Sequence, residues 1–204
     1  SIGQGVLPLI LRHIGVTPDR ITIVTADEAG LAEAKEYGIK FTINPLTREN
    51  YRKVLDPLLK RGDFLVNLSV DVSSLALVEF AHEKGVLYID TCIEPWPGGY
   101  TDPSLSPSHR TNYALREQAL ALRAKLKSGP TAVITHGANP GLVSHFVKQA
   151  LLNVAADTNV DAGNPSTREQ WAALAQKLQV KVIHIAERDT QVANTPKRPH
   201  EFVN

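Results

Sequence analysis

The sequence predicts an α/β fold, with parallel strands in a doubly wound sheet and the start of a second, α+β domain. Short segments rich in β-branched residues alternate with segments whose apolar residues recur at helical spacing. This alternation is typical of parallel strands joined by right-handed helical crossovers. In addition, Gly3 and Gly5 open the first helical segment, as in turns that hold a pyrophosphate at a helix N-terminus. Together these features predict a Rossmann-type sheet.

Each predicted element rests on a local signal. The first helix covers 6–14, where apolar residues form one face, and Gly15 is a typical helix end. The last helix begins with a predicted capping box at Ser166 and Glu169. The remaining helices are predicted at 28–38, 47–59, 72–85, 111–126, 142–157 and 166–178, and the strands at 20–27, 39–43, 63–69, 86–91, 131–136 and 180–187.

We expect the chain to be a fragment of a longer protein. The first strand of a dinucleotide-binding sheet lies at its centre, and here the helix that should follow it is present without it. The two flanking strands would then carry unpaired backbone groups, which are costly to bury. The chain also contains no Met. Two domains are predicted, an NAD-binding domain over 1–136 and the incomplete beginning of a substrate or catalytic domain over 137–204.

The composition argues against several classes of protein. The 204 residues include 22 basic and 21 acidic side chains, a net charge of +1, and no basic stripe indicates a nucleic-acid partner. No apolar run approaches the roughly 20 residues of a membrane span. Cys92 is the only cysteine, which excludes an internal disulfide and suits a reducing cytoplasm. No Cys or His spacing is of the zinc type, so no metal is predicted.

The first helix and second strand supply candidates for cofactor binding. Ser1, Ile2 and Gly3 precede the helix, and Gly3 reads as the third glycine of a G-x-G-x-x-G turn. A helix start in another α/β protein explains the same residues equally well. Asp27 is placed to hold a ribose or, alternatively, to cap the next helix. No Arg follows closely, which favours NAD over NADP.

Further candidates for cofactor binding lie at the carboxyl ends of two later strands, where open parallel sheets bind ligands. Asn67 and Ser69 are predicted to line the nicotinamide ribose, and Thr91 is predicted to contact the cofactor after the next strand. Helix capping by Asp71 or Ser73 is the alternative use of the first of these turns.

Three residues are candidates for substrate chemistry. Glu94 lies between an apolar strand and a Pro-Trp pair, which suits an organic cation, although a rim salt bridge worth ~0–1 kcal/mol is the alternative. Asn139 precedes a proline and is expected to be extended, with its amide aimed into the crevice. Glu187 and Asp189 share one face of the last strand, where they could bind ammonium groups, move protons or form a surface ion-pair cluster.

The motifs of the chain together resemble a known family. In register along nearly the whole chain, they are similar to the bacterial homospermidine synthases, which belong to the saccharopine dehydrogenase-like oxidoreductases. The stretches that carry the resemblance are SIGQGVLPLI, VNLSVDVSSLAL, LYIDTCIEPW, NYALRE, GANPGLVSHFVKQAL and IHIAERDTQ. In this family a strand and a GFG motif precede SIGQG, and a large catalytic portion follows FVN. Thr25 departs from the Asp expected at the strand end, which affects the expected ribose contact.

The resemblance implies a transferase of polyamine biosynthesis that uses NAD as a recycled hydride carrier. One putrescine is oxidised to an imine, ammonia leaves, a second putrescine condenses, and reduction gives homospermidine. Glu94 and Glu187 are implied to bind ammonium groups or transfer protons, and Asn139 to orient an amine. The resemblance also implies a homodimer of the full-length protein, and a stacking Trp just beyond Asn204.

Two alternatives remain open. The parent protein could be a saccharopine-type amino acid dehydrogenase, which would need Arg or Lys side chains to hold substrate carboxylates. The chain could also be a non-catalytic fragment of either enzyme, and on its own it is expected to be inactive.

Overall fold

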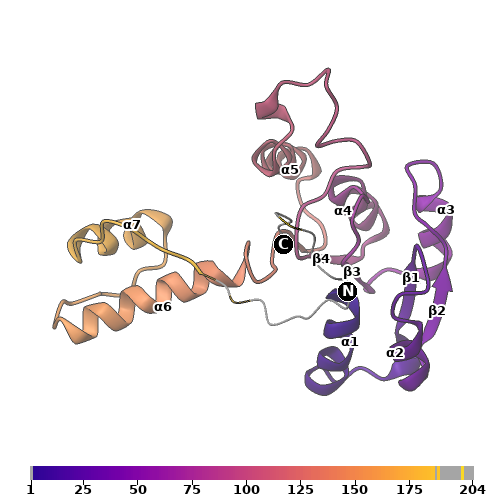
Figure 1. Cartoon of the computed structure of the whole chain (residues 1–204), viewed down its shortest axis with the longest axis horizontal. Coiled ribbons are helices and arrows are strands. Elements are labelled where there is room, and N and C mark those ends of the chain that lie inside the picture. Colours follow the sequence, from indigo (N-terminus) through magenta and orange to yellow (C-terminus); the bar gives the residue numbers. More distant parts are fainter. Residues whose placement is uncertain (1, 187, 189–198, 200–204) are drawn as a thin grey trace. The chain divides into compact units, whose positions relative to one another are not determined.

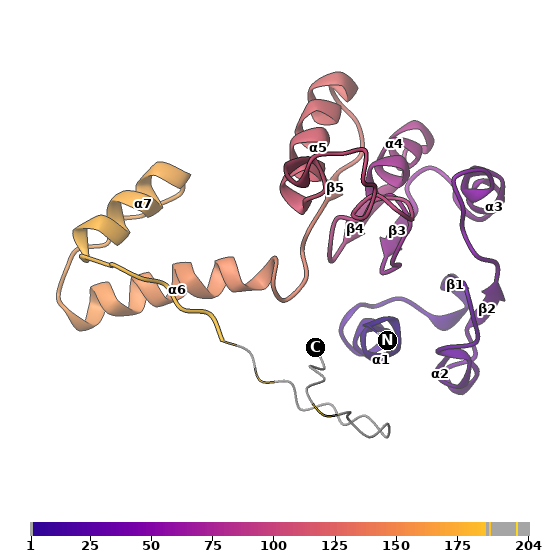
Figure 2. The ribbon, with the colours of Figure 1, turned by 45° about the horizontal axis from the view of Figure 1, so that its top comes forward.

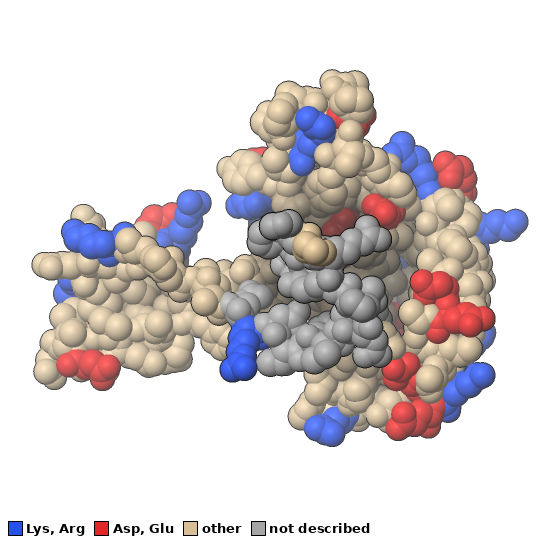
Figure 3. Space-filling model, in the orientation of Figure 1, with Lys and Arg blue, Asp and Glu red and all other residues tan. Residues whose placement is uncertain are grey.

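A computed structural model describes residues 2–186, 188 and 199 of the chain. Its contacts divide the chain into two compact units, Ser1–Leu142 and Val143–Asn204. Among the described residues, none of the helices has the length and apolar character needed to cross a membrane. Lys and Arg side chains are interspersed with Asp and Glu over the described surface on the face drawn in Figure 3.

The first unit contains parallel strands in two sheets (Figure 1). One sheet pairs β1 (Thr22–Thr25) with β2 (Lys40–Ile43). The other has the order β3-β4-β5, formed by Phe64–Asn67, Leu87–Asp90 and Ala132–Val133. All of these pairings are parallel, which confirms the predicted α/β fold class. The order expected for this fold places one further strand between β1 and β3, and in the described residues these two strands belong to different sheets.

Helices α1 (Ile2–His13) and α2 (Leu31–Glu36) pack with the first sheet. Their shared core contains Leu7 from α1, Ala34 from α2 and Ile39, all buried. The predicted start of the first helix at residue 6 is too late, because Gly3 and Gly5 already belong to α1. These glycines therefore lie inside the first turns of α1 and do not form a turn ahead of it. The N–H groups of a first helical turn have no partner within the helix.

The second sheet packs with α3 (Tyr51–Leu55) and α4 (Ser74–Lys84), and α4 lies beside β3 and β4 in Figures 1 and 2. Residues of α3, α4 and β4 form one apolar core, which includes Leu55, Leu77 and Tyr88. Helix α5 (Asn112–Leu126) contacts α4. Short 3₁₀ helices cover Pro18–Arg20, Asp56–Leu58 and Pro107–His109.

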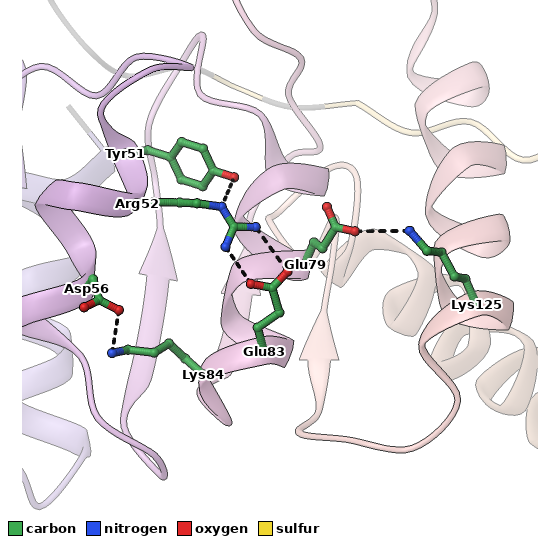
Figure 4. A network of polar contacts seen from close by, with 7 residues as sticks. All are labelled: Tyr51, Arg52, Asp56, Glu79, Glu83, Lys84 and Lys125. Carbon is green, nitrogen blue, oxygen red and sulfur yellow. Dashed lines mark hydrogen bonds and ion pairs between the residues drawn. The ribbon is translucent and has the colours of Figure 1, made fainter.

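Exposed ion pairs connect these helices (Figure 4). The Arg52 guanidinium on α3 donates to the Glu83 carboxylate on α4 at 2.5 Å and holds the pKa of Glu83 below its ordinary value. On α4, Glu79 pairs with Lys125 of α5 at 3.4 Å. Exposed pairs of this kind contribute roughly 0–1 kcal/mol each, so the apolar core rather than these pairs holds the helices in place.

The second unit packs α6 (Leu142–Asp157) against α7 (Arg168–Lys177) around Leu151, Ala155 and Leu174 (Figure 1). The capping box is present but lies one residue later than predicted. Thr167, not Ser166, is the N-cap, and its hydroxyl accepts the Gln170 N–H at 3.3 Å. The Gln170 side-chain oxygen in turn accepts the N–H groups of both Ser166 and Thr167, so Gln170 takes the place predicted for Glu169.

The predicted strand over 180–187 is not formed in residues 180–186, and Glu187 lies outside the described residues. The apolar side chains of Val182, Ile183 and Ile185 are about half exposed or more, at 65%, 54% and 49%. A β-branched run becomes a strand only when a neighbouring strand pairs with it, and no segment of the described chain does so here.

Candidate functional site

The predicted site residues of the first unit follow the carboxyl ends of its parallel strands. Such ends lie at one edge of a sheet, where open α/β folds bind their ligands. Ser1 and Glu187, which were predicted to contact the cofactor and the substrate, lie outside the described residues. Of the others, Asp27 follows β1, Asn67 is the last residue of β3 and Ser69 follows that strand, Thr91 and Glu94 follow β4, and Asn139 follows β5.

A buried chain of hydrogen bonds runs beneath the carboxyl ends of β3, β4 and β5. The Ser69 N–H donates to Asn67 Oδ1 at 3.2 Å, and Asn67 Nδ2 donates to the Tyr88 hydroxyl at 3.0 Å. Tyr88 donates to Asp90 Oδ2 at 2.8 Å, and the Thr135 N–H donates to Asp90 Oδ1 at 2.5 Å. Asn67 and Asp90 face each other in the sheet register, which puts their side chains on one face with Tyr88.

The members of this chain are among the most buried polar groups of the unit. Asp90 is 0% exposed, Tyr88 1% and Asn67 6%. Burial raises the pKa of Asp90, whereas the hydrogen bonds from Thr135 and Tyr88 act to lower it. Because the amide of Asn67 is engaged at both ends, its polar atoms are used inside the protein. Ser69, which is exposed, is the more accessible of the two residues predicted to meet the cofactor.

Glu94 is held at the site by its backbone. Its N–H donates to the Ser74 hydroxyl at 3.0 Å, and its carbonyl accepts the Ser74 N–H at 2.9 Å. Burial raises the pKa of Glu94, and the charges of Asp71 and Asp90 raise it further, while a hydrogen bond from Cys92 acts in the opposite direction. The side chain is therefore a partly buried carboxylate in a negative field, which is an environment that favours a cation.

The aromatic residue beside Glu94 differs from the one expected. Trp96 packs into the apolar core, with its ring 5.5 Å from that of Tyr51. Burial raises the pKa of the Tyr100 phenol to about 12, and the charge of Glu94 raises it as well. Its hydroxyl lies 3.0 Å from the Ile93 carbonyl and 2.6 Å from Asn112 Oδ1. The phenol thus remains protonated near neutral pH.

Asn139 lies at the exposed tip of a closed loop, 137–141. The loop is closed by hydrogen bonds from the Gly137 N–H to the Pro140 carbonyl and from the Leu142 N–H to the Gly137 carbonyl. A Cβ on Gly137 would lie 2.8 Å from the Thr91 carbonyl oxygen, so only glycine allows this approach to β4. The loop thus packs against the residue that follows β4, and the contacts of the chain place it in the first compact unit, which ends at Leu142. The boundary between the NAD-binding and substrate domains at 136 stays a prediction.

The structure separates the alternative roles of two aspartates and a serine. Asp27 does not cap α2, whose N-cap is Gly30; its carboxylate accepts the Ala29 N–H at 2.8 Å and remains exposed. Ser73 caps α4, since its hydroxyl accepts the Ala76 N–H at 3.3 Å. Asp71 has no capping role and adopts a left-handed φ of 61°, with its charge acting on Glu94.

Sequence reasoning missed Asp90, Asp71 and Tyr100 as members of this site. A carboxylate as the last residue of an apolar, buried strand is the signal that could have identified Asp90, since an unpaired charge is rarely buried without a role. The left-handed backbone at Asp71 and the approach of Tyr100 to Glu94 have no local signature. Among the described residues, no cluster of His, Cys, Asp or Glu has the arrangement of a metal site.

The chain is similar to two curated proteins and to one solved structure of the same name. Homospermidine synthase of Blastochloris viridis is 55% identical over the whole chain, and that of Mesorhizobium japonicum is 46% identical. The chain spans 43% of the length of each of these relatives. A crystal structure of homospermidine synthase from Legionella pneumophila in complex with NAD superposes with a TM-score of 0.84 at 43% identity, covering 97% of this chain and 40% of that one.

The family assignment follows from a match over most of the chain. Residues 1–133 match the model of the saccharopine dehydrogenase NADP binding domain. This stretch includes both parallel sheets and the carboxyl-end residues described above, apart from Thr135 and the Asn139 loop. The chain therefore belongs to the saccharopine dehydrogenase NADP-binding domain family.

Proposed function

We propose that the protein containing this chain is an NAD-dependent homospermidine synthase, which converts two putrescine molecules into homospermidine and ammonia. The observation that carries the proposal is the negative environment of Glu94, whose neighbouring charges are those of Asp71 and Asp90. Putrescine and its products are polyammonium ions, and carboxylates bind such ions by charge-assisted hydrogen bonds. The names of the relatives support the same reaction.

NAD is the proposed cofactor, and the accessible groups at the carboxyl edge fit a nucleotide. Asp27 and Ser69 are exposed there, and Thr91 is partly exposed. The first turn of α1, which contains Ile2 and Gly3, has helix N–H groups available to an anion. When bound, NAD would accept and return a hydride. The complex of the Legionella enzyme with NAD supports this choice of cofactor.

The chain's own residues would then manage protons and position the amines. A protonated amine cannot release a hydride from its neighbouring carbon, so a base must first remove one of its protons. Glu94 suits this role because its raised pKa brings it closer to neutral pH than an ordinary glutamate. The Asn139 amide is proposed to orient the amine. Glu187 remains a predicted second carboxylate of the site.

The second candidate, an amino acid dehydrogenase of the saccharopine type, needs cationic side chains around the reacting carbon to hold a carboxylate. The charges acting on Glu94 are acidic, which favours the diamine over the amino acid. We further propose that residues 1–136 bind NAD and that 137–204 begin the substrate domain. The proposed full-length protein is a cytoplasmic homodimer without a nucleic-acid or membrane partner, and its free Cys92 thiol suits a reducing compartment.

The test uses the protein encoded by the complete reading frame. It is incubated with putrescine and less than one equivalent of NAD, and mass spectrometry follows homospermidine and ammonia. Product in excess of NAD is expected, because the hydride is recycled. Putrescine deuterated at both terminal carbons should give homospermidine that retains the transferred deuterium, since the same hydride is removed and returned.

Two variants make this test specific for the site. E94Q should lower kcat/KM by roughly 10²–10⁴, the usual contribution of a general base. E79Q serves as the matched control, because Glu79 pairs with the exposed Lys125 on the surface of α4 and α5 (Figure 4). The proposal would be contradicted if no homospermidine formed and NADH accumulated when an amino acid was supplied as the substrate. That result would support the dehydrogenase.

A further inference from the structure

The hydrogen bonds of the buried chain all run in the direction of Asp90. The backbone N–H groups of Ser69 and Thr135 can only donate, and they fix its two ends. Since Ser69 donates to Asn67 Oδ1, the Asn67 amine must face the Tyr88 hydroxyl and donate to it. The Tyr88 hydroxyl, which also interacts with the Ser74 hydroxyl, donates its own proton to Asp90 Oδ2. Every proton in the chain is therefore directed toward Asp90.

Asp90 accepts on both carboxylate oxygens. Oδ2 accepts from Tyr88, which leads to β3, and Oδ1 accepts from Thr135, which follows β5. A carboxylate can accept both of these hydrogen bonds. An amide of the same shape cannot, because its NH₂ group would face either the Tyr88 hydroxyl or the Thr135 N–H, and both of these groups donate. The chain of bonds thus explains why a charged residue lies 0% exposed at the end of β4. It also ties the turn after β3, with Ser69, to the backbone after β5.

On the β5 side, Asp90 holds a rare backbone conformation. Thr135 has a φ of 61°, in the left-handed region that β-branched residues seldom adopt. Its N–H is held by the Asp90 carboxylate at 2.5 Å, and the His136 N–H is held by the Asp90 carbonyl at 3.0 Å. These two bonds set the direction in which the backbone enters the loop 137–141, which carries Asn139.

A third branch leads to Glu94. The buried Ser74 hydroxyl interacts with both the Asp90 carboxylate and the Tyr88 hydroxyl, and it acts to lower the pKa of each of these groups. The same hydroxyl accepts the Glu94 N–H at 3.0 Å. One buried carboxylate is thus linked to each of the three segments that carry Ser69, Glu94 and Asn139.

We infer that Asp90 is a positioning residue, whose carboxylate sets the Asn139 loop and Glu94 relative to the cofactor-side turn at Ser69. This role rests on the proposed function of the site. Asp90 does not need to touch the substrate, because it acts through Thr135 and Ser74. Misplacement of reacting groups by about 1 Å can cost roughly 100-fold in rate, so the link is kinetically significant.

The experiment compares D90N and Y88F with wild type in the complete protein. We expect D90N to lower kcat by about 10–100-fold per folded, NAD-loaded enzyme, with a smaller change in KM for putrescine. Y88F removes only the hydroxyl that joins Asn67 to Asp90, and a several-fold loss of kcat is expected. V86A is the matched control, since Val86 is 1% exposed in the same core but outside the chain of bonds.

V86A should lower the melting temperature without changing kcat or KM per folded enzyme. The inference is overturned if D90N and Y88F behave like V86A, with reduced melting temperatures and unchanged kcat. If D90N does not fold, Y88F decides the question by the same comparison. A wild-type protein that forms no homospermidine would instead overturn the proposed function, and with it the role of Asp90 in that reaction.

Discussion

Exchanging the chemical identities of residues 67 and 90 should reverse the buried hydrogen-bond chain and preserve it. In D90N, the amide introduced at position 90 still accepts the Thr135 N–H with its oxygen, but its amine faces the Tyr88 hydroxyl. Tyr88 could turn its proton toward Asn67 only if that amide also turned, and the Asn67 amide would then present an amine to the Ser69 N–H. Within the protein, the mismatch can be moved only as far as the Ser69 N–H, at the exposed end of the chain.

The expected loss of stability in each single variant follows from which donors keep an acceptor. D90N leaves one donor of the chain without an acceptor in the protein, which lowers the free energy of unfolding by about 1–3 kcal/mol if that donor is the buried Tyr88 hydroxyl or the amine at position 90. N67D places a carboxylate on each side of the single Tyr88 proton and should cost at least as much. In N67D/D90N, the amide at position 90 donates to Tyr88, and Tyr88 donates to the carboxylate at position 67. That carboxylate also accepts the Ser69 N–H, so every buried donor has an acceptor again.

The assay is urea unfolding of the complete protein, followed by circular dichroism, for the two single variants and the double variant. We expect a coupling free energy of about 2 kcal/mol or more in favour of the double variant. The control cycle is E79K/K125E on the exposed pair of α4 and α5, for which coupling of no more than about 1 kcal/mol is expected. Additive effects of N67D and D90N would refute the assigned direction of the hydrogen bonds.

Three further predictions concern individual residues. Burial raises the pKa of Glu94 above its unfolded value, so its contribution favours folding at low pH and is lost as the pH rises through the folded pKa; E94Q should therefore melt higher than wild type at pH 8 and equally at pH 4. G137A puts a Cβ 2.8 Å from the Thr91 carbonyl oxygen and should lower the free energy of unfolding by about 1–3 kcal/mol. It should also lower kcat, and a kcat equal to that of the wild type would contradict this prediction. S73A removes the cap that accepts the Ala76 N–H and should lower the free energy of unfolding by about 1 kcal/mol, whereas an unchanged urea midpoint would show that the cap contributes nothing.

Local signals in the sequence were sufficient for most of the fold. Alternating strand and helix patterns predicted the parallel α/β class, because period and propensity act over neighbouring residues. They also located Glu94 and Asn139 after the ends of strands. The capping box was displaced by one residue, from Ser166 to Thr167, since adjacent Ser and Thr offer equivalent hydroxyls and the choice depends on which partner Gln170 meets.

Signals that depend on distant partners could not be read from the sequence. The run at 180–186 has strand composition but no strand beside it in the described chain, and pairing is not a local property. The same holds for Trp96, which resembles a cation-binding aromatic in sequence but packs onto Tyr51 of α3. Whether an aromatic faces a ligand or the core is decided by its neighbours in space.

The sequence by itself determined the α/β class, the family motifs and the residues at the strand ends, because these are written in spacing and residue type. Only the tertiary structure decided that Asp90 joins those strand ends. Its partners Tyr88, Thr135 and Ser74 come from different segments, and the left-handed backbone at Thr135 has no signature in its own sequence. Hydrogen-bond direction is a property of assembled donors and acceptors, and it exists only once the strands have been brought side by side.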